Sequence, residues 1–178
     1  MRNEFSDSAL KVESGLLPIR LPSQYPHLSS KDPAVHGMTD FTRKLPFSVG
    51  PERSTDEALA DMVRFGVRAL LVVCGDSVIG LITSYGIENA GKPAGSVRVG
   101  DVMTPWNDLP TVDWSTIQSS RIADLLEIFH GIGVMHLLVV EGRDGIGPTM
   151  VRGLVARARC EDRLTKADAL PYEYQKAG

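Results

Sequence analysis

Cysteine is scarce in this chain of 178 residues, with only Cys74 and Cys160, which lie far apart in the sequence. Neither belongs to a paired framework or to a metal-ligand spacing, so the sequence predicts no structural disulfide and no zinc site. This pattern is typical of a reducing compartment, or of a fold that is indifferent to redox state. We therefore expect packing of the 43% hydrophobic residues to stabilise the core.

Long apolar runs and a strong charge of one sign are also missing. No segment approaches the roughly 20 apolar residues that a membrane-spanning helix needs. The charged start of the chain, Met1 to Ser14, does not resemble a signal peptide. The formal net charge is -3 with acids and bases interspersed, so no basic stripe is present to bind nucleic acid. We expect a soluble, cytoplasmic protein with neither nucleic acid nor membrane as a partner.

The residue patterns of common enzymes are absent as well. There is no glycine-rich phosphate loop with lysine, no His-Glu-x-x-His and no nucleophile-elbow serine. Cys74 precedes a turn, where a small packing residue is a commoner interpretation than a reactive thiol. His27 and His36 lie in a proline-rich lead-in that does not anchor a metal site. We predict that the protein is not an enzyme and holds no metal.

An internal repeat organises the chain. The segment 66–73, GVRALLVV, returns at 133–140 as GVMHLLVV, with six of eight positions identical. Each copy is followed by a turn and a second apolar run, at 78–82 and at 150–155, so each half contains a strand hairpin. The central strands are apolar without alternation. We therefore expect both faces of each to be covered, by helices and by the other repeat.

An amphipathic helix precedes each hairpin. In the first half, Ser54 and Glu57 form a capping box. The residues expected to share its apolar face are Leu59, Met62 and Val63. In the second half, Ser119 or Ser120 is the expected cap, and Gly131 and Gly133 stop the helix. Its apolar face has helical spacing: Ile122, Leu125, Leu126 and Phe129.

The predicted fold class is α/β (α+β), with two pseudo-symmetric repeats that are each a small three-stranded sheet packed by two helices. One repeat alone has too little core, so the two should pack together. The predicted boundaries are an extended N-terminal segment at 1–34, a first repeat at 35–90, a linker at 91–96, a second repeat at 97–165 and a C-terminal tail at 166–178.

These landmarks resemble the CBS (cystathionine beta-synthase) domain, once in each half, from about Val35 to about Thr165. The family lead-in is matched by Val102-Met103-Thr104 and, less fully, by Met38-Thr39. Leu71 and Leu138 stand where the family often has proline, and they fill similar apolar volume. The resemblance implies a tandem CBS pair, or Bateman module, that stands alone and forms a disc-like homodimer.

The chain departs from the family at the ligand motif. The family places a Thr or Ser near phosphate, and an Asp three residues later on the ribose hydroxyls. Here the first copy has Thr83 and Gly86, and the second has Ala156 and Arg159. A carboxylate accepts hydrogen bonds from two vicinal hydroxyls, which neither Gly86 nor Arg159 can do. The missing Asp argues against recognition of a ribose, so the ligand site expected here is one for an anion.

The resemblance implies ligand contacts at six positions: Arg68, Thr83, Thr111, His136, Arg157 and Arg159. Arg68 and Thr83 together suit a phosphate, because a guanidinium is a charged fork and a hydroxyl is a neutral donor. The alternative interpretations are structural. Arg68 would be a cation at a helix C-terminus, Thr83 the cap of the next helix, and His136 an interior-edge histidine that donates to a carbonyl.

We predict a regulatory protein that binds a small ligand, an adenosine nucleotide or a related anion, and that forms a homodimer. The ligands that the resemblance implies are AMP, ADP, ATP and S-adenosylmethionine, and no cofactor is otherwise expected. An effector protein would receive the signal, and the sequence does not identify it. The alternative is a purely structural dimerisation or interaction module with degenerate nucleotide sites.

Overall fold

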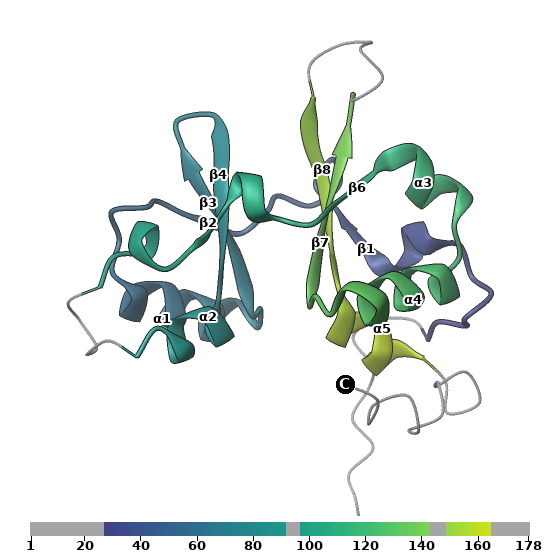
Figure 1. The fold of residues 1–178 in the computed structure, drawn as a ribbon, viewed down its shortest axis with the longest axis horizontal. Helices are drawn as coiled ribbons and strands as arrows, with labels where there is room; N and C mark the ends of the chain where they lie inside the picture. Colours follow the sequence, from purple (N-terminus) through teal and green to yellow (C-terminus); the bar gives the residue numbers. More distant parts are fainter. Residues whose placement is uncertain (1–26, 92–96, 143–148, 165–178) are drawn as a thin grey trace, which may run out of the picture.

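The computed structural model of the protein describes residues 27–91, 97–142 and 149–164. These residues form two lobes that lie side by side, each a four-stranded sheet with helices packed on it (Figure 1). The predicted α/β fold class with two similar repeats is confirmed. Much of the predicted N-terminal segment, the linker and the C-terminal tail lies outside the described residues.

The first lobe has the strand order β2-β3-β4-β5. Its elements are β2 (Ser48–Val49), α1 (Thr55–Phe65), β3 (Ala69–Cys74), β4 (Ser77–Thr83), α2 (Ser84–Asn89), the 3-10 helices η2 (Val99–Asp101) and η3 (Trp106–Asp108), and β5 (Thr104–Pro105). Strand β2 runs parallel to β3, and β4 runs antiparallel to both β3 and β5.

The second lobe repeats this order as β6-β7-β8-β1. Its elements are the 3-10 helix η1 (Ala34–Gly37), β1 (Met38–Asp40), β6 (Thr111–Asp113), α3 (Trp114–Ser119), α4 (Ile122–Ile132), β7 (His136–Glu141), β8 (Met150–Ala156) and α5 (Arg157–Arg163). Strand directions match those of the first lobe, with β6 parallel to β7 and β8 antiparallel to β7 and β1. The two halves therefore share one topology.

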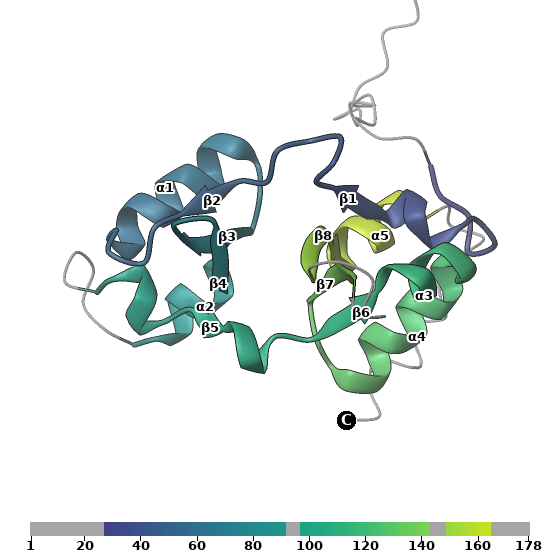
Figure 2. The same ribbon diagram turned by 90° about the horizontal axis from the view of Figure 1, so that it is seen from above.

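Each sheet takes its fourth strand from the other half of the chain. Strand β1 leads the first repeat but pairs with β8 of the second, and β5 leads the second repeat but pairs with β4 of the first. Residues 41–47 and 106–110 cross between the lobes in opposite directions, and Figure 2 shows them as two bridges. The three strands expected in each repeat are present, and this exchange adds the fourth.

A glycine makes each exchanged contact close. Gly153 on β8 lies against β1, where an added Cβ would stand 2.6 Å from the carbonyl oxygen of Thr39 and 2.9 Å from the sulfur of Met38. At the equivalent Gly80, a Cβ would stand 2.6 Å from the carbonyl oxygen of Thr104. Real Cβ atoms do not approach backbone so closely, so both positions require glycine for steric reasons.

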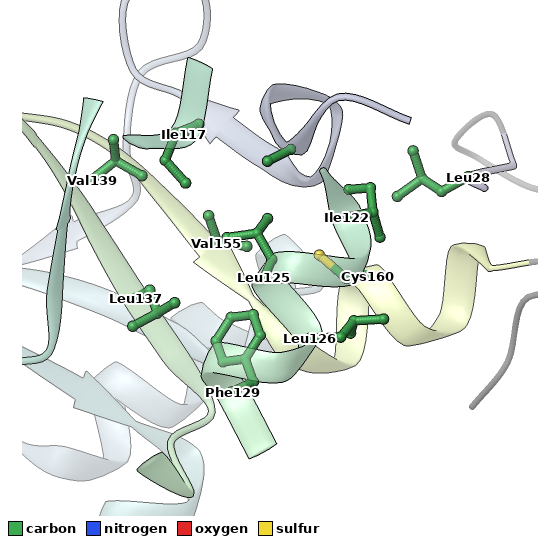
Figure 3. Packing of buried hydrophobic residues seen from close by; sticks show 11 residues of the cluster. Leu28, Ile117, Ile122, Leu125, Leu126, Phe129, Leu137, Val139, Val155 and Cys160 are labelled. Carbon is green, nitrogen blue, oxygen red and sulfur yellow. The ribbon is translucent and has the colours of Figure 1, made fainter. Parts of the chain in front are cut away.

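The core has three parts, which follow from the two apolar faces of each central strand. In the first lobe, Leu70 and Val72 of β3 face α1, and in the second lobe Leu137 and Val139 of β7 face α4 (Figure 3). The opposite faces meet between the lobes in a third cluster, whose buried members are Ala69, Leu71, Leu81, Leu109 and Leu138. The prediction that both faces of the central strands are covered is confirmed.

Local sequence signals predict the N-terminus of one of the two long helices correctly and that of the other incorrectly. Ser54 and Glu57 form the predicted capping box at α1, with the Ser54 hydroxyl accepting from the Glu57 N–H at 3.2 Å. The predicted cap of the second helix is wrong, because α4 begins at Ile122 and its N-cap is Arg121. Ser119 instead ends α3, where its hydroxyl donates to carbonyl oxygens within that helix.

One residue of the predicted apolar face of α1 is also misplaced. Met62 is buried, but the side chain of Val63 is 80% exposed. The buried positions are Thr55, Ala58 and Met62, so the core-facing stripe turns away before Val63. Val63 therefore contributes to the protein surface and not to the core.

Substitution of Gly153 by alanine should loosen the exchanged strand. The added Cβ would collide with the backbone of β1, so we expect the free energy of unfolding to fall by about 1 to 3 kcal/mol. Urea denaturation measures this change. Gly131→Ala is the matched control: no atom lies within 4 Å of its Cβ position in α4, so it should be neutral or stabilising by up to about 1 kcal/mol. Equal effects of both variants would contradict the steric argument.

Candidate functional site: a cavity between the lobes

A cavity of about 680 Å³ lies between the two lobes. One wall comes from the first repeat, with the bridge at 41–47, the end of α1 and the start of β3. The other wall comes from β1, the start of β7, β8 and α5. The volume is in the range typical of small-molecule sites. Because both lobes supply the lining, a ligand here would contact both repeats.

Positive charge dominates the lining of this cavity. Its cationic side chains are Lys44, Arg64, Arg68, Arg159 and Arg163, whereas Asp162 supplies the one carboxylate among the described lining residues. Interiors with a large excess of one charge attract ligands of the opposite charge. The cavity is therefore suited chemically to an anion.

Arg159 is held in place by the exchanged strand. Its Nη1 donates to the Thr39 hydroxyl at 2.7 Å, although the two residues are 120 positions apart in the sequence. Arg159 is half-buried on α5, and Thr39 is half-buried on β1. The contact fixes a guanidinium at the wall of the cavity, where little side-chain entropy remains to be lost when an anion binds.

His136 contributes a neutral polar group to the same wall. It is the first residue of β7, opposite Ala156 on β8. Burial lowers the pKa of His136 to about 4, because the charged imidazolium is poorly solvated there. At neutral pH the imidazole is uncharged and offers one donor and one acceptor nitrogen. It therefore adds hydrogen-bonding capacity to the cavity without adding charge.

Two stacked aromatic rings form part of the first wall. Phe47 and Phe65 are nearly parallel, with ring centroids 4.4 Å apart. Lys44 lies 5.5 Å from the Phe47 ring centroid, and the Arg64 guanidinium lies 5.6 Å from that of Phe65. Such cation–π contacts orient long side chains that would otherwise move freely. The stack therefore ties the bridge at 41–47 to the end of α1 and holds two cations near the cavity.

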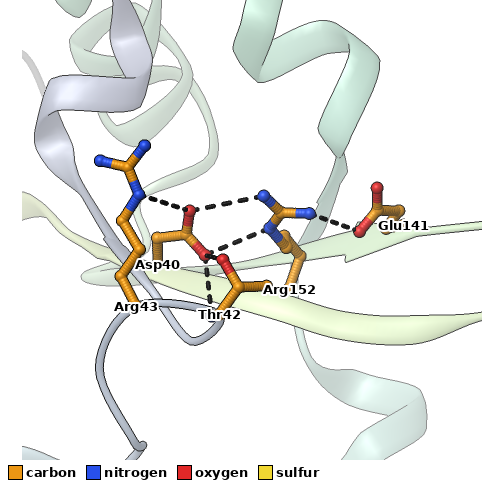
Figure 4. A network of polar contacts seen from close by, with 5 residues as sticks. All are labelled: Asp40, Thr42, Arg43, Glu141 and Arg152. Atoms are coloured by element: carbon orange, nitrogen blue, oxygen red, sulfur yellow. Dashed lines mark hydrogen bonds and ion pairs between the residues drawn. The ribbon is translucent and has the colours of Figure 1, made fainter.

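A polar network secures β1 to the second lobe (Figure 4). Arg152 on β8 donates to Asp40 on β1 at 3.2 Å and to Glu141 on β7 at 2.8 Å. Its guanidinium also lies 4.5 Å from the ring centroid of Trp114. Burial acts to raise the pKa of Asp40, but hydrogen bonds from Thr42 and Arg152 outweigh it and leave that pKa below its usual value. The network keeps the strand that supplies part of the cavity wall in register.

Three of the six contact residues predicted from the sequence line the cavity: Arg68, His136 and Arg159. They come from the turn before β3, the start of β7 and α5. Arg68 is exposed, whereas the other two are half-buried. The structure thus brings together residues from both repeats that lie far apart in the sequence.

The other three predicted residues lie outside this lining. Thr83 is the N-cap of α2, where its hydroxyl accepts from the Gly86 N–H at 3.0 Å, in agreement with the structural alternative. Arg157 donates to Glu161 at 2.7 Å. Thr111 lies in β6, at the edge of the second sheet. The proposed phosphate site between Arg68 and Thr83 does not form part of this cavity.

Five polar or charged residues of the cavity lining were not predicted as site residues from the sequence. They are Thr39, Lys44, Arg64, Asp162 and Arg163. The duplication of Met38-Thr39 as Met103-Thr104 marked Thr39 as part of a repeat, but not as a neighbour of Arg159. That proximity depends on the strand exchange, for which the sequence contains no local signal.

Cys160 is fully buried against Gly37, and burial raises the pKa of its thiol to about 11, so it is a packing residue.

Within residues 27–91, 97–142 and 149–164, no three His, Cys, Asp or Glu side chains gather as a metal site would require. In the same ranges no helix has the length and apolar character needed to cross a bilayer.

Lowering the pH should destabilise the fold through His136. Its pKa is about 4 in the folded protein and about 6.5 in an unfolded chain, so the unfolded state binds the extra proton between these values. The stability is complete above about pH 6.5 and is lost as the pH falls toward 4, by about 2 to 3 kcal/mol. Urea denaturation at pH 7 and pH 4.5 measures the loss.

His136→Leu should remove that part of the pH dependence, because leucine does not titrate. His36→Gln removes an exposed imidazole and should keep the wild-type dependence. If the His136→Leu protein lost as much stability at pH 4.5 as the wild type, the assignment to His136 would be wrong.

Comparison with known proteins finds a family match within the first half of the chain. The family model described as CBS domain matches residues 38–91. No curated protein matches the chain. The matched range begins at β1 and ends just after α2.

Solved structures resemble both halves together. An uncharacterized conserved protein from Pyrococcus horikoshii is 22% identical, with a TM-score of 0.56 over 74% of this chain and 91% of that one. The CBS-pair protein CBSX2 from Arabidopsis thaliana is 21% identical, with a TM-score of 0.51 over 74% and 92%. CBSX2 in complex with AMP is 22% identical, with a TM-score of 0.50 over 73% and 93%. Residues 38–91 therefore match the CBS domain, and the two halves together have the fold of solved CBS pairs.

Proposed function

We propose that this protein is a regulatory module that binds a small anionic ligand in the cavity between its lobes. The observation that carries the proposal is the cluster of five cationic side chains around a cavity of about 680 Å³, with one carboxylate among the described lining residues. The role is regulatory rather than catalytic, and the effector that receives the signal is a separate protein. The cytoplasmic location expected from the sequence stays a prediction.

Ligand binding in this cavity would act on the arrangement of the lobes. Arg68 belongs to the wall from the first repeat, and Arg159 and His136 belong to the wall from the second lobe. An anion that contacts residues of both walls stabilises the relative position of the two lobes in which both walls are in contact with it. A ligand shifts a conformational equilibrium by its difference in affinity for the two states. This coupling is the physical basis for a regulatory role.

An adenosine nucleotide is the first ligand to test, and CBSX2 in complex with AMP supports that choice. The phosphate would bind to the arginines, because guanidinium groups form charged, forked hydrogen bonds with phosphate oxygens. Fewer residues of the cavity are suited to bind the ribose. Arg159 is a donor that already contacts Thr39, so Asp162 is the carboxylate available to vicinal hydroxyls. We therefore expect phosphate recognition to dominate, and ADP or ATP to bind at least as well as AMP.

A thermal-shift panel tests the proposal. The compounds are AMP, ADP, ATP, guanosine phosphates and S-adenosylmethionine. A ligand at a hundredfold excess over its dissociation constant stabilises the folded state by about 2.7 kcal/mol. For a chain of this size, this corresponds to a rise in Tm of about 5 to 10 °C.

The charge-neutral variant Arg159→Gln should reduce the shift severalfold, because it removes one cation from the cavity wall. Arg98→Gln is the matched control, since Arg98 is exposed and pairs with Glu52 away from the cavity. If no compound raises Tm, or if both variants respond like the wild type, this cavity is not the anion site.

Dimerisation is the second part of the proposal, and it also supports the alternative function of a purely structural interaction module. Apolar side chains are exposed on the helices of both lobes: Tyr85 on α2 is 73% exposed and Ile132 on α4 is 57% exposed. Exposed apolar groups of this kind favour contact with another chain. A second copy is the partner that we propose, because most soluble oligomers are symmetric homo-oligomers.

Sedimentation analysis at micromolar concentrations should show a particle of twice the 19.3 kDa chain mass. Tyr85→Asp together with Ile132→Asp should weaken the dimer at least about tenfold, because two buried charges would lack partners. Met150→Asp is the control, since Met150 has the same 57% exposure as Ile132 but lies on β8. A monomer at high micromolar concentration would contradict the proposal.

A further inference from the structure

Four of the residues that line the cationic cavity are exposed apolar side chains. They are Leu45, Val63, Phe65 and Met135, and all four belong to the cavity lining. Leu45 is 86% exposed and Val63 is 80% exposed. We call these four residues the apolar rim.

The rim and the deeper lining differ in chemistry. The rim residues are exposed, as are the cations Lys44, Arg64 and Arg68, whereas the guanidinium-bearing Arg159 and Arg163 are half-buried together with Thr39 and His136. The cavity thus combines exposed apolar and cationic side chains with a half-buried interior that carries the positive charges of Arg159 and Arg163. Scattered exposed apolar residues are normal on a protein surface, but here four of them border one cavity that carries an excess of positive charge.

This arrangement separates the two ends of a ligand. A negatively charged head lowers its free energy at the cations of the interior, and an apolar body lowers its free energy against the rim, where exposed aliphatic and aromatic surface leaves water. A polar sugar would gain little at the rim, because the four rim side chains carry no hydrogen-bond donor and only the weak thioether acceptor of Met135.

We infer that the cavity takes an amphiphilic anion, with a phosphate or carboxylate head bound in the interior and an apolar body of several carbons lying on the apolar rim. This inference rests on the proposed function of the cavity as an anion site and specifies the ligand class. The ligand is a free small molecule, since its head would reach the half-buried Arg159 and Arg163 within the cavity.

The test compares two phosphates with the same head. Octyl phosphate and methyl phosphate are titrated into the full chain by calorimetry, at concentrations below micelle formation. Octyl phosphate should bind at least about tenfold more tightly, because it alone can cover the rim. Octanoate should also bind, which reports whether the head must be a phosphate ester or can be a carboxylate.

Variants of the apolar rim test whether it causes the difference in affinity between octyl phosphate and methyl phosphate. Leu45→Ser with Val63→Ser should bring octyl phosphate to within about twofold of methyl phosphate, and should leave methyl phosphate unchanged. Both positions are largely exposed, so the fold should tolerate them, and Tm verifies this. The control pair, Tyr85→Ser with Met150→Ser, removes exposed apolar groups outside the lining and should keep the full difference.

The outcomes separate this inference from the proposed function. Equal binding of the two phosphates, or an octyl advantage that survives loss of Leu45 and Val63, overturns the amphiphile inference and leaves the anion site standing. AMP binding more tightly than octyl phosphate also overturns it, in favour of a nucleotide. If neither phosphate nor AMP binds, the proposed function itself fails. Binding to phosphatidic acid vesicles without binding to monomeric octyl phosphate would contradict the assignment to a free molecule.

Discussion

The exchange of leading strands between the two halves is the constraint on which the rest of this structure depends. Without this exchange, β4 and β8 would be unpaired edges of their sheets, and an exposed edge is a site of unwanted pairing. Strand β1 pairs with β8 in the second sheet, and β5 pairs with β4 in the first. Gly80 and Gly153 permit the approach because a side chain at either position would strike the incoming backbone. Neither half can leave the other without opening both sheets.

The cavity is a consequence of this exchange. Because β1 lies in the second sheet, the chain must cross back to reach β2, and the bridge at 41–47 becomes a wall of the cavity. The same path brings Thr39 to Arg159 and carries Phe47 to the ring of Phe65. The network around Arg152 holds β1 in register. Packing that stabilises the pair of lobes therefore also positions the charges of the candidate site.

The two repeats share a backbone but differ in chemistry. At equivalent positions, Thr83 caps α2 in the first repeat, whereas Ala156 precedes α5 and lines the cavity in the second. Likewise Gly86 corresponds to Arg159. The symmetric fold thus presents different side chains to a ligand on its two sides. We regard the arginine at the second position as the main reason to favour an anion over a ribose as the recognised group.

The sequence by itself determined the duplicated hairpins, the coverage of the central strands and the capping box at Ser54, because each depends on spacing within a few residues. It did not determine the start of α4, where Arg121 occupies the N-cap position, or the exposure of Val63. Only the tertiary structure decided the strand exchange and the cavity. The bond from Arg159 to Thr39 spans 120 positions. No local pattern encodes such a contact, since it exists only after two sheets have packed together.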